Sequence, residues 1–516
     1  MSFDRRAFLR YGGGAVAAGV LTGGWSAPSS ALPAGTTIPW DRLRTLLQGT
    51  LVLPSDAAYP VAKELFFSQY DTVSPAAVAY CTSEQDVQQC LRFAQDHGVA
   101  LVPRSGGHSH AGYSTGPGLV LDLSALNSLT VNPAAGSADT PTVTVGPGVQ
   151  QIDSLTALAP AGLALVGGSC PTVGAAGFLQ GGGYGLLSPS AGMGCDHLLS
   201  ARVVLADGSV VTASAKEHPD LFWALRGGGG GNFGVVTSFE VSPLGITSLV
   251  NYSLTWGWDV AAQVLGAWQE WVARGPRELG TTLTVALTDA APGTAAVLNV
   301  SGAWRGSVSS LNQCLDDLTA LVGSAPDTRQ ADQLSYRDAM MAHYGCADDT
   351  AAQCHRVGVT ADGLLPRGTF LTQRNRMFRT PLPGSGVSGL LAAFDADRRA
   401  GHTRLLSAAG LGGAINDVAR DATAYVHRDT VFQLIGIDTV GTADPAAAEQ
   451  AAAQSWVTGV FEAMDPYSNG ESYQNMPDPA LTDWRRSYYA ENHPRLAATK
   501  ALYDPHRFFT FPQAIG

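Results

Sequence analysis

Three glycine-rich segments within residues 104–234 restrict the fold of this chain more than any other feature of its sequence. The first is Arg104 to His110, the second runs from Gly174 to Gly185, and the third runs from Arg226 to Gly234. Because glycine has no Cβ, the backbone can approach a ligand closely, and rows of free N–H groups can hold a pyrophosphate. One such segment alone is more often a tight turn or a helix-packing site. Three together indicate a loop-built site for a nucleotide-type cofactor.

None of the three segments fits the dinucleotide fingerprint of the Rossmann fold. That fingerprint needs spaced glycines between a first strand and its helix, with an acidic residue about 20 positions later. Nicotinamide binding is therefore not supported. His108 and His110 could in principle chelate a metal, but no Glu or third His stands at ligand spacing beside them. Metal binding is a minor alternative, and we predict no metal.

Size and charge limit the class of protein. At a prior of about 150 residues per domain, 516 residues should form two or three domains with a large core. Hydrophobic residues make up 45% and charged residues 14%, which excludes intrinsic disorder. The formal net charge of −12 would repel nucleic acids and anionic membranes. We expect no nucleic-acid or membrane partner, and the sequence does not specify an oligomeric state.

The first 34 residues have the pattern of an export signal. Arg5 and Arg6 precede a weakly apolar run from Gly12 to Leu21 and then a stretch of small residues. This pattern is typical of a twin-arginine signal, and we expect cleavage near Ala27 to Ala34. The alternative is an ordinary N-terminal helix with two chance arginines, which Pro28 and the glycines disfavour. No later run approaches the roughly 20 apolar residues of a membrane span, so we expect a secreted, extracellular mature protein.

Hydrophobic periodicity predicts an α/β first part and a different second part. An amphipathic helix is expected from Asp86, and Asp207-Gly208 predicts a hairpin. Strands are expected at 99–102, 119–123, 142–145, 201–205 and 209–213. Beyond Pro243, strands at 249–255, 282–287 and 297–304 alternate with helices at 259–273 and 309–322. We place a domain boundary near Leu244.

The seven cysteines leave at least one outside any intramolecular disulfide. Cys346 and Cys354 lie in one polar loop, close enough in sequence to form a disulfide in an oxidising compartment. Cys90 and Cys314 lie on apolar helix faces, which favours buried thiols.

Two of the loops resemble motifs of the flavoprotein oxidases related to berberine bridge enzyme, in the vanillyl-alcohol-oxidase superfamily. Arg104-Ser105-Gly106-Gly107-His108 resembles the loop whose histidine is bonded to the flavin 8α-methyl group. Gly168-Ser169-Cys170-Pro171-Thr172 resembles the segment whose cysteine is bonded to flavin C6. The resemblance covers about Pro39 to Gly516 and returns at the C-terminus, from Tyr488 to Asn492 and through Phe511-Pro512-Gln513.

The resemblance implies an α+β fold and FAD attached through His108 and Cys170. The expected organisation is a two-part α/β FAD-binding domain of the PCMH type at 35–244, and a substrate domain at 245–469 with an antiparallel sheet covered by helices. A C-terminal segment, 470–516, is expected to return to the FAD domain. The other cofactor-binding residues that the resemblance implies are Arg104, Ser105, Gly106, Gly107, Ser109, Gly174, Gly177, Gly182, Gly185, Val236 and Asn492.

The resemblance also points to Tyr473 as the catalytic base, because sugar-oxidising members use the tyrosine of a Tyr-x-Asn segment, here Tyr473-Gln474-Asn475. A phenol has a pKa near 10, so the site must lower the pKa if it is to act as a base. The structural alternative is a tyrosine in an apolar turn.

The chain departs from the family pattern at Leu411, where several members carry an acidic or tyrosine partner of the base. Leu411 cannot assist proton transfer, so His427 or Asn416 is left as a candidate helper, each with a structural role as the alternative. Tyr488 or Tyr489 is expected to line the cleft.

These observations predict an exported FAD-dependent oxidase. It would oxidise an alcohol or hemiacetal carbon of a small molecule, a saccharide or glycosylated secondary metabolite, and reduce O2 to H2O2. The first alternative is dehydrogenation or oxidative cyclisation of a polyketide or alkaloid. The second is a protein that sequesters an antibiotic, with little or no catalysis by the flavin.

Overall fold

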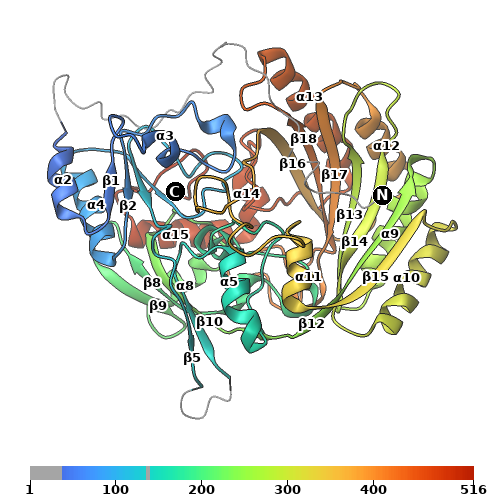
Figure 1. Ribbon diagram of the computed structural model, residues 1–516, viewed down its shortest axis with the longest axis horizontal. Coiled ribbons are helices and arrows are strands. Elements are labelled where there is room, and N and C mark those ends of the chain that lie inside the picture. Colours follow the sequence, from blue (N-terminus) through green and yellow to red (C-terminus); the bar gives the residue numbers. More distant parts are fainter. Residues whose placement is uncertain (1–37, 135–139) are drawn as a thin grey trace.

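The computed structural model describes residues 38–134 and 140–516, so the expected export signal lies outside the described residues. The chain has an α+β fold, as predicted, with mixed and antiparallel sheets and helices packed on them (Figure 1). Within the described residues, no helix is both long enough and apolar enough to cross a membrane.

Two sheets form the part of the molecule that precedes Leu244. The first has the order β1-β2-β4-β3, in which β2, β4 and β3 run parallel and β1 is antiparallel to β2. Its strands are Thr50–Val52, Ala77–Tyr80, Leu119–Asp122 and Leu101–Arg104 in that order. The second is antiparallel, with the order β5-β6-β10-β8-β9, at Leu129–Asn132, Thr142–Val145, Val235–Val241, Leu198–Val204 and Val210–Ser214. A short pair, β7 (Leu163–Ala164) and β11 (Leu244–Gly245), follows.

Helices of this part include α4 (Glu84–Asp96), which starts where the Ser83 side chain accepts a hydrogen bond from the amide of Asp86. Its apolar face, with Val87 and Cys90, is buried against the first sheet, as the periodicity predicts. The remaining helices are α2 (Trp40–Leu46), α3 (Tyr59–Ala62), α5 (Gln151–Leu158), α6 (Ala175–Gln180), α7 (Ser188–Ala191) and α8 (Pro219–Leu225).

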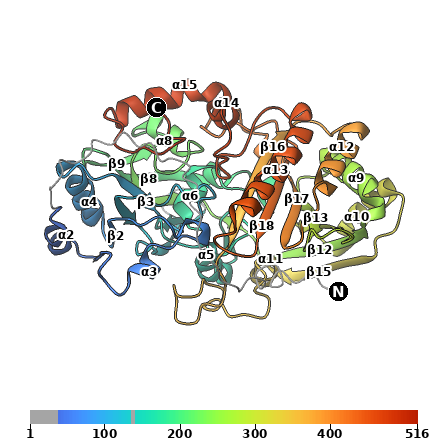
Figure 2. The ribbon, with the colours of Figure 1, turned by 90° about the horizontal axis from the view of Figure 1, so that it is seen from above.

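A single antiparallel sheet of seven strands follows, with the order β15-β12-β14-β13-β17-β18-β16. In chain order, β12 to β18 are Ser248–Gly257, Leu279–Leu287, Val297–Trp304, Thr328–Ser335, Phe370–Phe378, His402–Gly410 and Phe432–Val440. Four helices, α9 (Ala261–Arg274), α10 (Val308–Val322), α12 (Gly384–Asp395) and α13 (Ala447–Met464), cover the face turned away from the first part (Figure 2). The strands β16 and β18 at one edge therefore turn their other face toward the glycine-rich loops.

The C-terminal residues return to the first part of the molecule. Helices α14 (Trp484–Tyr489) and α15 (His493–Tyr503) lie over it, and α15 packs on α8 (Figure 2). Lys500, which is buried, donates to the carbonyl oxygen of Asn232 and forms an ion pair with Asp504. This contact joins the C-terminal helix to the third glycine-rich segment. One further helix, α11 (Tyr336–His343), leads into the disulfide loop.

The cysteines agree with the predictions except at one position. Cys346 and Cys354 form a disulfide with a Cα–Cα distance of 5.9 Å. Cys90 is fully buried, 3.9 Å from the sulfur of Cys81. Cys314 is only half-buried, because the apolar face of α10 is centred on Leu311, Leu315 and Leu318 and Cys314 lies at its margin.

A buried histidine in the seven-stranded sheet makes stability depend on pH. His402 contacts Asp438 through Nδ1 at 2.8 Å and Glu449 through Nε2 at 2.9 Å, and the hydrogen bond to Asp438 raises its pKa above the ordinary 6.5. A raised folded-state pKa contributes stability that is complete below the unfolded-state value and is lost as the pH rises through the folded-state value. We expect the difference in unfolding free energy between the wild type and His402→Gln to be larger near pH 6 than near pH 9. Guanidinium unfolding at both pH values measures it, and an equal difference at both would contradict this role.

Candidate active site

All three glycine-rich segments line one cavity of about 470 Å³, together with the exposed face of β16 and β18 and the C-terminal residues. Its wall on the sheet side carries Leu371 and Gln373 from β16 and Ile435 and Ile437 from β18. These four side chains share one face, because Gln373 pairs with Ile437 across the two strands and residues two apart point the same way. The cavity thus lies between the loops and the seven-stranded sheet.

Thr172 holds the two expected attachment residues close together. Its Oγ1 lies 2.8 Å from Nε2 of His108 and 3.7 Å from the sulfur of Cys170, and both residues line the cavity. The ring of Phe66 stacks on the His108 ring with centroids 4.1 Å apart. Burial lowers the pKa of His108 to about 3, assisted by the nearby charges of His110 and Arg356. His108 is therefore a neutral imidazole whose Nε2 is occupied by Thr172.

The loops that carry these residues touch through glycine backbone. A Cβ on Gly106 would lie 2.5 Å from the amide nitrogen of Gly174, and a Cβ on Gly174 would lie 2.2 Å from Oγ of Ser105. Glycine is required at both positions because the two loops meet at backbone distance. Gly177, by contrast, has open space where a Cβ would stand and borders the cavity. The two loops form a cradle with room for a ligand against bare backbone.

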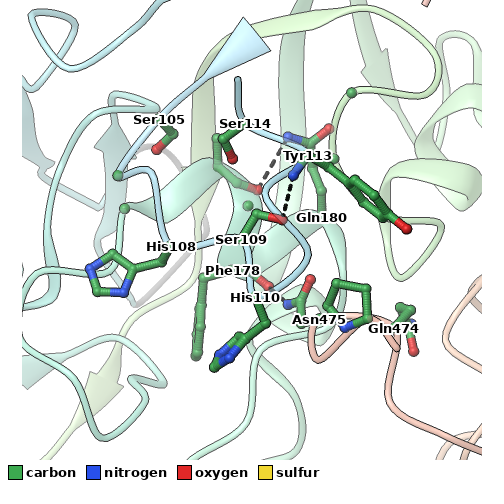
Figure 3. A pocket seen from close by; sticks show the side chains of 18 of the residues that line it. Ser105, His108, Ser109, His110, Tyr113, Ser114, Phe178, Gln180, Gln474 and Asn475 are labelled. Carbon is green, nitrogen blue, oxygen red and sulfur yellow. Dashed lines mark hydrogen bonds between the residues drawn. The ribbon is translucent and has the colours of Figure 1, made fainter. Parts of the chain in front are cut away.

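Most of the other predicted cofactor residues also border this cavity, in particular Arg104, Ser105, Gly106, Gly107, Ser109, Gly174 and Val236. Arg104 does so with its guanidinium held by Asp122 and by the carbonyl oxygen of Ala62. The Ser109 hydroxyl accepts a hydrogen bond from the amide of Tyr113 at 3.0 Å, which shapes the loop (Figure 3).

Three predicted cofactor residues are not brought to the cavity. Gly182 and Gly185 lie outside its lining, and their missing side chains instead make room for the Tyr425 ring and for the carbonyl oxygen of Gly167. Asn492 donates to the carbonyl oxygens of Arg420 and Thr423 at 2.7 and 3.2 Å, away from the lining residues. These three residues support the loops around the site, Asn492 through its hydrogen bonds and the two glycines through close packing.

Tyr473 lies in the cavity wall with only 3% of its surface exposed. Its hydroxyl oxygen accepts hydrogen bonds from the amide of Gly183 at 2.8 Å and from Nδ2 of Asn475 at 3.2 Å. Burial raises the pKa of Tyr473, and the two donated hydrogen bonds act in the opposite direction. Two donors directed at one phenol oxygen stabilise the charge that forms when the phenol loses its proton. Both hydrogen bonds suit a base, but burial outweighs them, so the residues of the chain raise the pKa of Tyr473 above its ordinary value, opposite to the lowering that a base requires.

A second tyrosine, Tyr184 of the second glycine-rich segment, stands beside Tyr473. The Tyr184 ring lies 5.0 Å from the Tyr473 ring, and its hydroxyl donates to Oε1 of Gln433 at 2.7 Å. Gln433 in turn donates to Oδ1 of Asn375, which also accepts from the amide of Tyr473. The sheet therefore holds both tyrosines through two buried amides. The only sequence signal for Tyr184 was its place in the Gly183-Tyr184-Gly185 motif.

The position expected to carry a partner of the base, Leu411, does not line the cavity. The two candidate helpers, Asn416 and His427, do not line it either. Leu411 is buried at the end of β17, and Asn416 donates to the carbonyl oxygen of Thr430. His427 is fully buried between Glu471 and Gln474. Tyr488 and Tyr489 do line the cavity. Figure 3 shows Gln474 and Asn475 across the view from His108.

The donor set fits a flavin nucleotide. His110 Nδ1 and Tyr113 Oη line the cavity and are buried without a hydrogen-bond partner among the described residues, so a bound group can satisfy them. The bare backbone of Gly177 leaves space for a phosphate-bearing chain, and Gly230 and Gly231 line the same cavity. The cavity thus offers polar atoms and backbone of the kind that hold a dinucleotide.

Several known proteins match most of the chain. Family models described as "FAD binding domain" and "Berberine and berberine like" match residues 75–214 and 472–516. The FAD-linked oxidoreductase YvdP of Bacillus subtilis is 30% identical over 91% of this chain and 98% of its own. Xylooligosaccharide oxidase of Thermothelomyces thermophilus is 29% identical, over 86% of this chain and 87% of its own.

A solved structure shares the fold. Glucooligosaccharide oxidase from Acremonium strictum, described with 6-S-cysteinyl, 8α-N1-histidyl FAD, is 25% identical with a TM-score of 0.78, over 90% of this chain and 97% of that one. The sequence match to YvdP covers nearly the full length of both proteins, and the fold and both family models agree with it. This chain belongs to the berberine-bridge-enzyme-like family of FAD-linked oxidoreductases.

Proposed function

We propose that this protein is an exported oxidase that carries FAD bonded to His108 and Cys170 and oxidises an alcohol or hemiacetal carbon of a saccharide or glycoside. In this reaction the substrate carbon and its hydroxyl group each lose one hydrogen, the carbon becomes a carbonyl, and O2 takes up both hydrogens to form H2O2. The observation that carries the attachment is the contact of both residues with Thr172. Since Thr172 occupies Nε2 of His108, Nδ1 is the nitrogen left for the bond. The proposal that the protein is exported rests on Arg5 and Arg6, the arginine pair of the expected signal.

The residues of the chain divide the chemistry between them. Bound FAD would accept a hydride from the substrate carbon and pass the electrons to O2. Tyr473 would take the hydroxyl proton of the substrate, because Gly183 and Asn475 donate to its oxygen and its side chain lines the cavity beside Tyr184. The buried amides of Asn375 and Gln433 keep the two tyrosines in place, so the base does not have to be ordered when the substrate binds.

A second candidate substrate class is favoured by one observation. Three aliphatic side chains, Leu371, Ile435 and Ile437, form most of the sheet side of the cavity. Such a wall favours an alcohol with an apolar body, as in a polyketide, over a fully hydroxylated sugar chain.

A peroxide-coupled assay tests these proposals. The purified protein is supplied with xylobiose, cellobiose and 4-methoxybenzyl alcohol in air, and H2O2 and the product mass are recorded. A product two mass units lighter than the substrate, or 16 mass units heavier where a sugar lactone has taken up water to open to the acid, formed with an equal amount of H2O2, supports the oxidase. Oxidation of the aryl alcohol alone favours the apolar class. Tight binding of an aromatic compound without turnover or H2O2 would contradict both and favour sequestration.

A further inference from the structure

One buried histidine links the residues on either side of Tyr473. His427, which has no exposed surface, lies with Nδ1 2.7 Å from Oε2 of Glu471 and Nε2 3.1 Å from Oε1 of Gln474. Glu471 precedes Tyr473 by two residues, and Gln474 follows it directly. The same imidazole thus holds both flanks of the proposed base.

The hydrogen-bond partners of the His427 ring indicate that both of its nitrogens carry a proton. Gln474 donates its Nε2 to the carbonyl oxygen of Gly227 at 2.6 Å, so the atom that faces His427 is its amide oxygen, an acceptor. Glu471 presents a carboxylate oxygen, also an acceptor. Both ring nitrogens must therefore donate, and an imidazole that donates from both nitrogens is a cation.

The surroundings of His427 suit a buried cation. Its partner Glu471 is itself buried, and although burial alone would raise the pKa of this carboxyl, the hydrogen bonds and charges of His427 and Arg420 lower it to about 2. The Tyr425 ring stands edge-on to the His427 ring with centroids 5.1 Å apart. Arg420 and Arg379 pair with the other carboxylate oxygen of Glu471, Oε1, at 2.7 and 3.4 Å, which leaves Oε2 to His427. A charged pair with its other hydrogen bonds satisfied is the form in which buried charges persist.

We propose that His427 is an imidazolium that clamps Glu471 and Gln474 and thereby positions Tyr473 for proton transfer. This inference rests on the proposed function of Tyr473. His427 does not line the cavity, so it acts as a positioning residue through the 471–475 segment. Removing the clamp takes away the contacts with Oε2 of Glu471 and Oε1 of Gln474, and leaves Glu471 with Arg420 and Arg379 as its charged partners. The amide of Tyr473 still donates to Asn375, but the residues on either side of it lose their shared contact.

The seven-stranded sheet provides a matched control. His402 is equally buried and also contacts two acceptors, Asp438 and Glu449, but it lies outside the residues that line the cavity. His427→Gln and His402→Gln therefore remove the same kind of ring from the same kind of ionic site. A merely structural role predicts similar behaviour of the two variants.

Two measurements need no substrate. In protein labelled with ¹⁵N-histidine, we expect the His427 signals, assigned by their absence in H427Q, to show a bonded proton on both ring nitrogens at neutral pH. A proton on only one nitrogen would overturn the imidazolium. In hydrogen exchange, the Tyr473 amide should exchange faster in H427Q than in the wild type or in H402Q. Equal exchange in all three proteins would overturn the clamp.

Kinetics then separate this inference from the proposed function. With saturating xylobiose, flavin reduction in H427Q should be about 10- to 100-fold slower with the substrate affinity nearly unchanged, because a small misplacement of a catalytic group can cost 10²-fold. H402Q should reduce its flavin at the wild-type rate. Gln474→Leu removes one acceptor of the clamp and should also slow flavin reduction. This variant replaces H427Q in the test if H427Q does not fold.

The outcomes are distinguishable. A wild-type rate in H427Q and Q474L combined with a slow Tyr473→Phe variant would overturn the positioning role and leave the proposed base in place. A wild-type rate in Y473F as well would overturn the base. If xylobiose reduces no flavin in the wild type, the saccharide proposal fails, and the nitrogen signals and amide exchange still decide the clamp.

Discussion

Replacing Tyr473 by phenylalanine should slow the reduction of bound FAD by substrate about 10²-fold or more, the usual contribution of a well-placed general base. The change removes one oxygen, to which the Gly183 amide and Asn475 donate, and it keeps the ring that packs beside Tyr184. The flavin content should therefore stay near that of the wild type. Stopped-flow absorbance of the flavin under anaerobic conditions measures the rate directly.

The matched control is Tyr467→Phe, which removes the same oxygen from a tyrosine that is 38% exposed and lies outside the cavity lining. Its rate of flavin reduction should equal that of the wild type. A Y473F enzyme that reduces its flavin as fast as Y467F would remove Tyr473 from the role of base.

Replacing Gly174 by valine should abolish the incorporation of FAD. A Cβ at this position would lie 2.2 Å from Oγ of Ser105 and 2.6 Å from the amide nitrogen of Gly106, so the two loops must move apart. Their separation would carry His108 away from Thr172 and Cys170, which lie on the facing loop. The ratio of flavin to protein absorbance after purification gives the result.

Gly266→Ala in helix α9 is the control, because a Cβ there meets open space and alanine favours a helix. It should bind as much FAD as the wild type. A G174V protein that carries a full complement of FAD would show that the close approach of the loops is not needed for the site.

The sequence predicts those elements whose pattern is local and regular. The face of α4 with Val87 and Cys90, the strand β6 and the hairpin at Asp207-Gly208 agree with the structure because periodicity and turn residues alone specify them. The strands β16, β17 and β18 were not predicted. In β17, His402 and Arg404 occupy buried positions of the alternation, where they pair with Asp438 of β18. Charged residues that are buried with their partners conceal the pattern of an inward face.

Motifs also identify some of the site residues, and others are recognised only in the structure. His108, Cys170 and Tyr473 were identified from motifs and border one cavity. Asn492, Gly182 and Gly185 were identified from the same family resemblance but do not border it, since a motif also includes residues that support its loops. The roles of Thr172, Tyr184 and Gln433 depend on contacts between segments far apart in the chain, which no local pattern encodes.

The most direct test of the central claim is whether FAD stays bonded to the polypeptide after unfolding. The purified protein is denatured in guanidinium and desalted, and its visible spectrum and intact mass are recorded for the wild type, H108A, C170A and the double variant. We predict that the wild type and each single variant keep the flavin colour and one FAD-sized mass increment, while the double variant loses both. Flavin that washes out of the denatured wild type would contradict covalent attachment through His108 and Cys170.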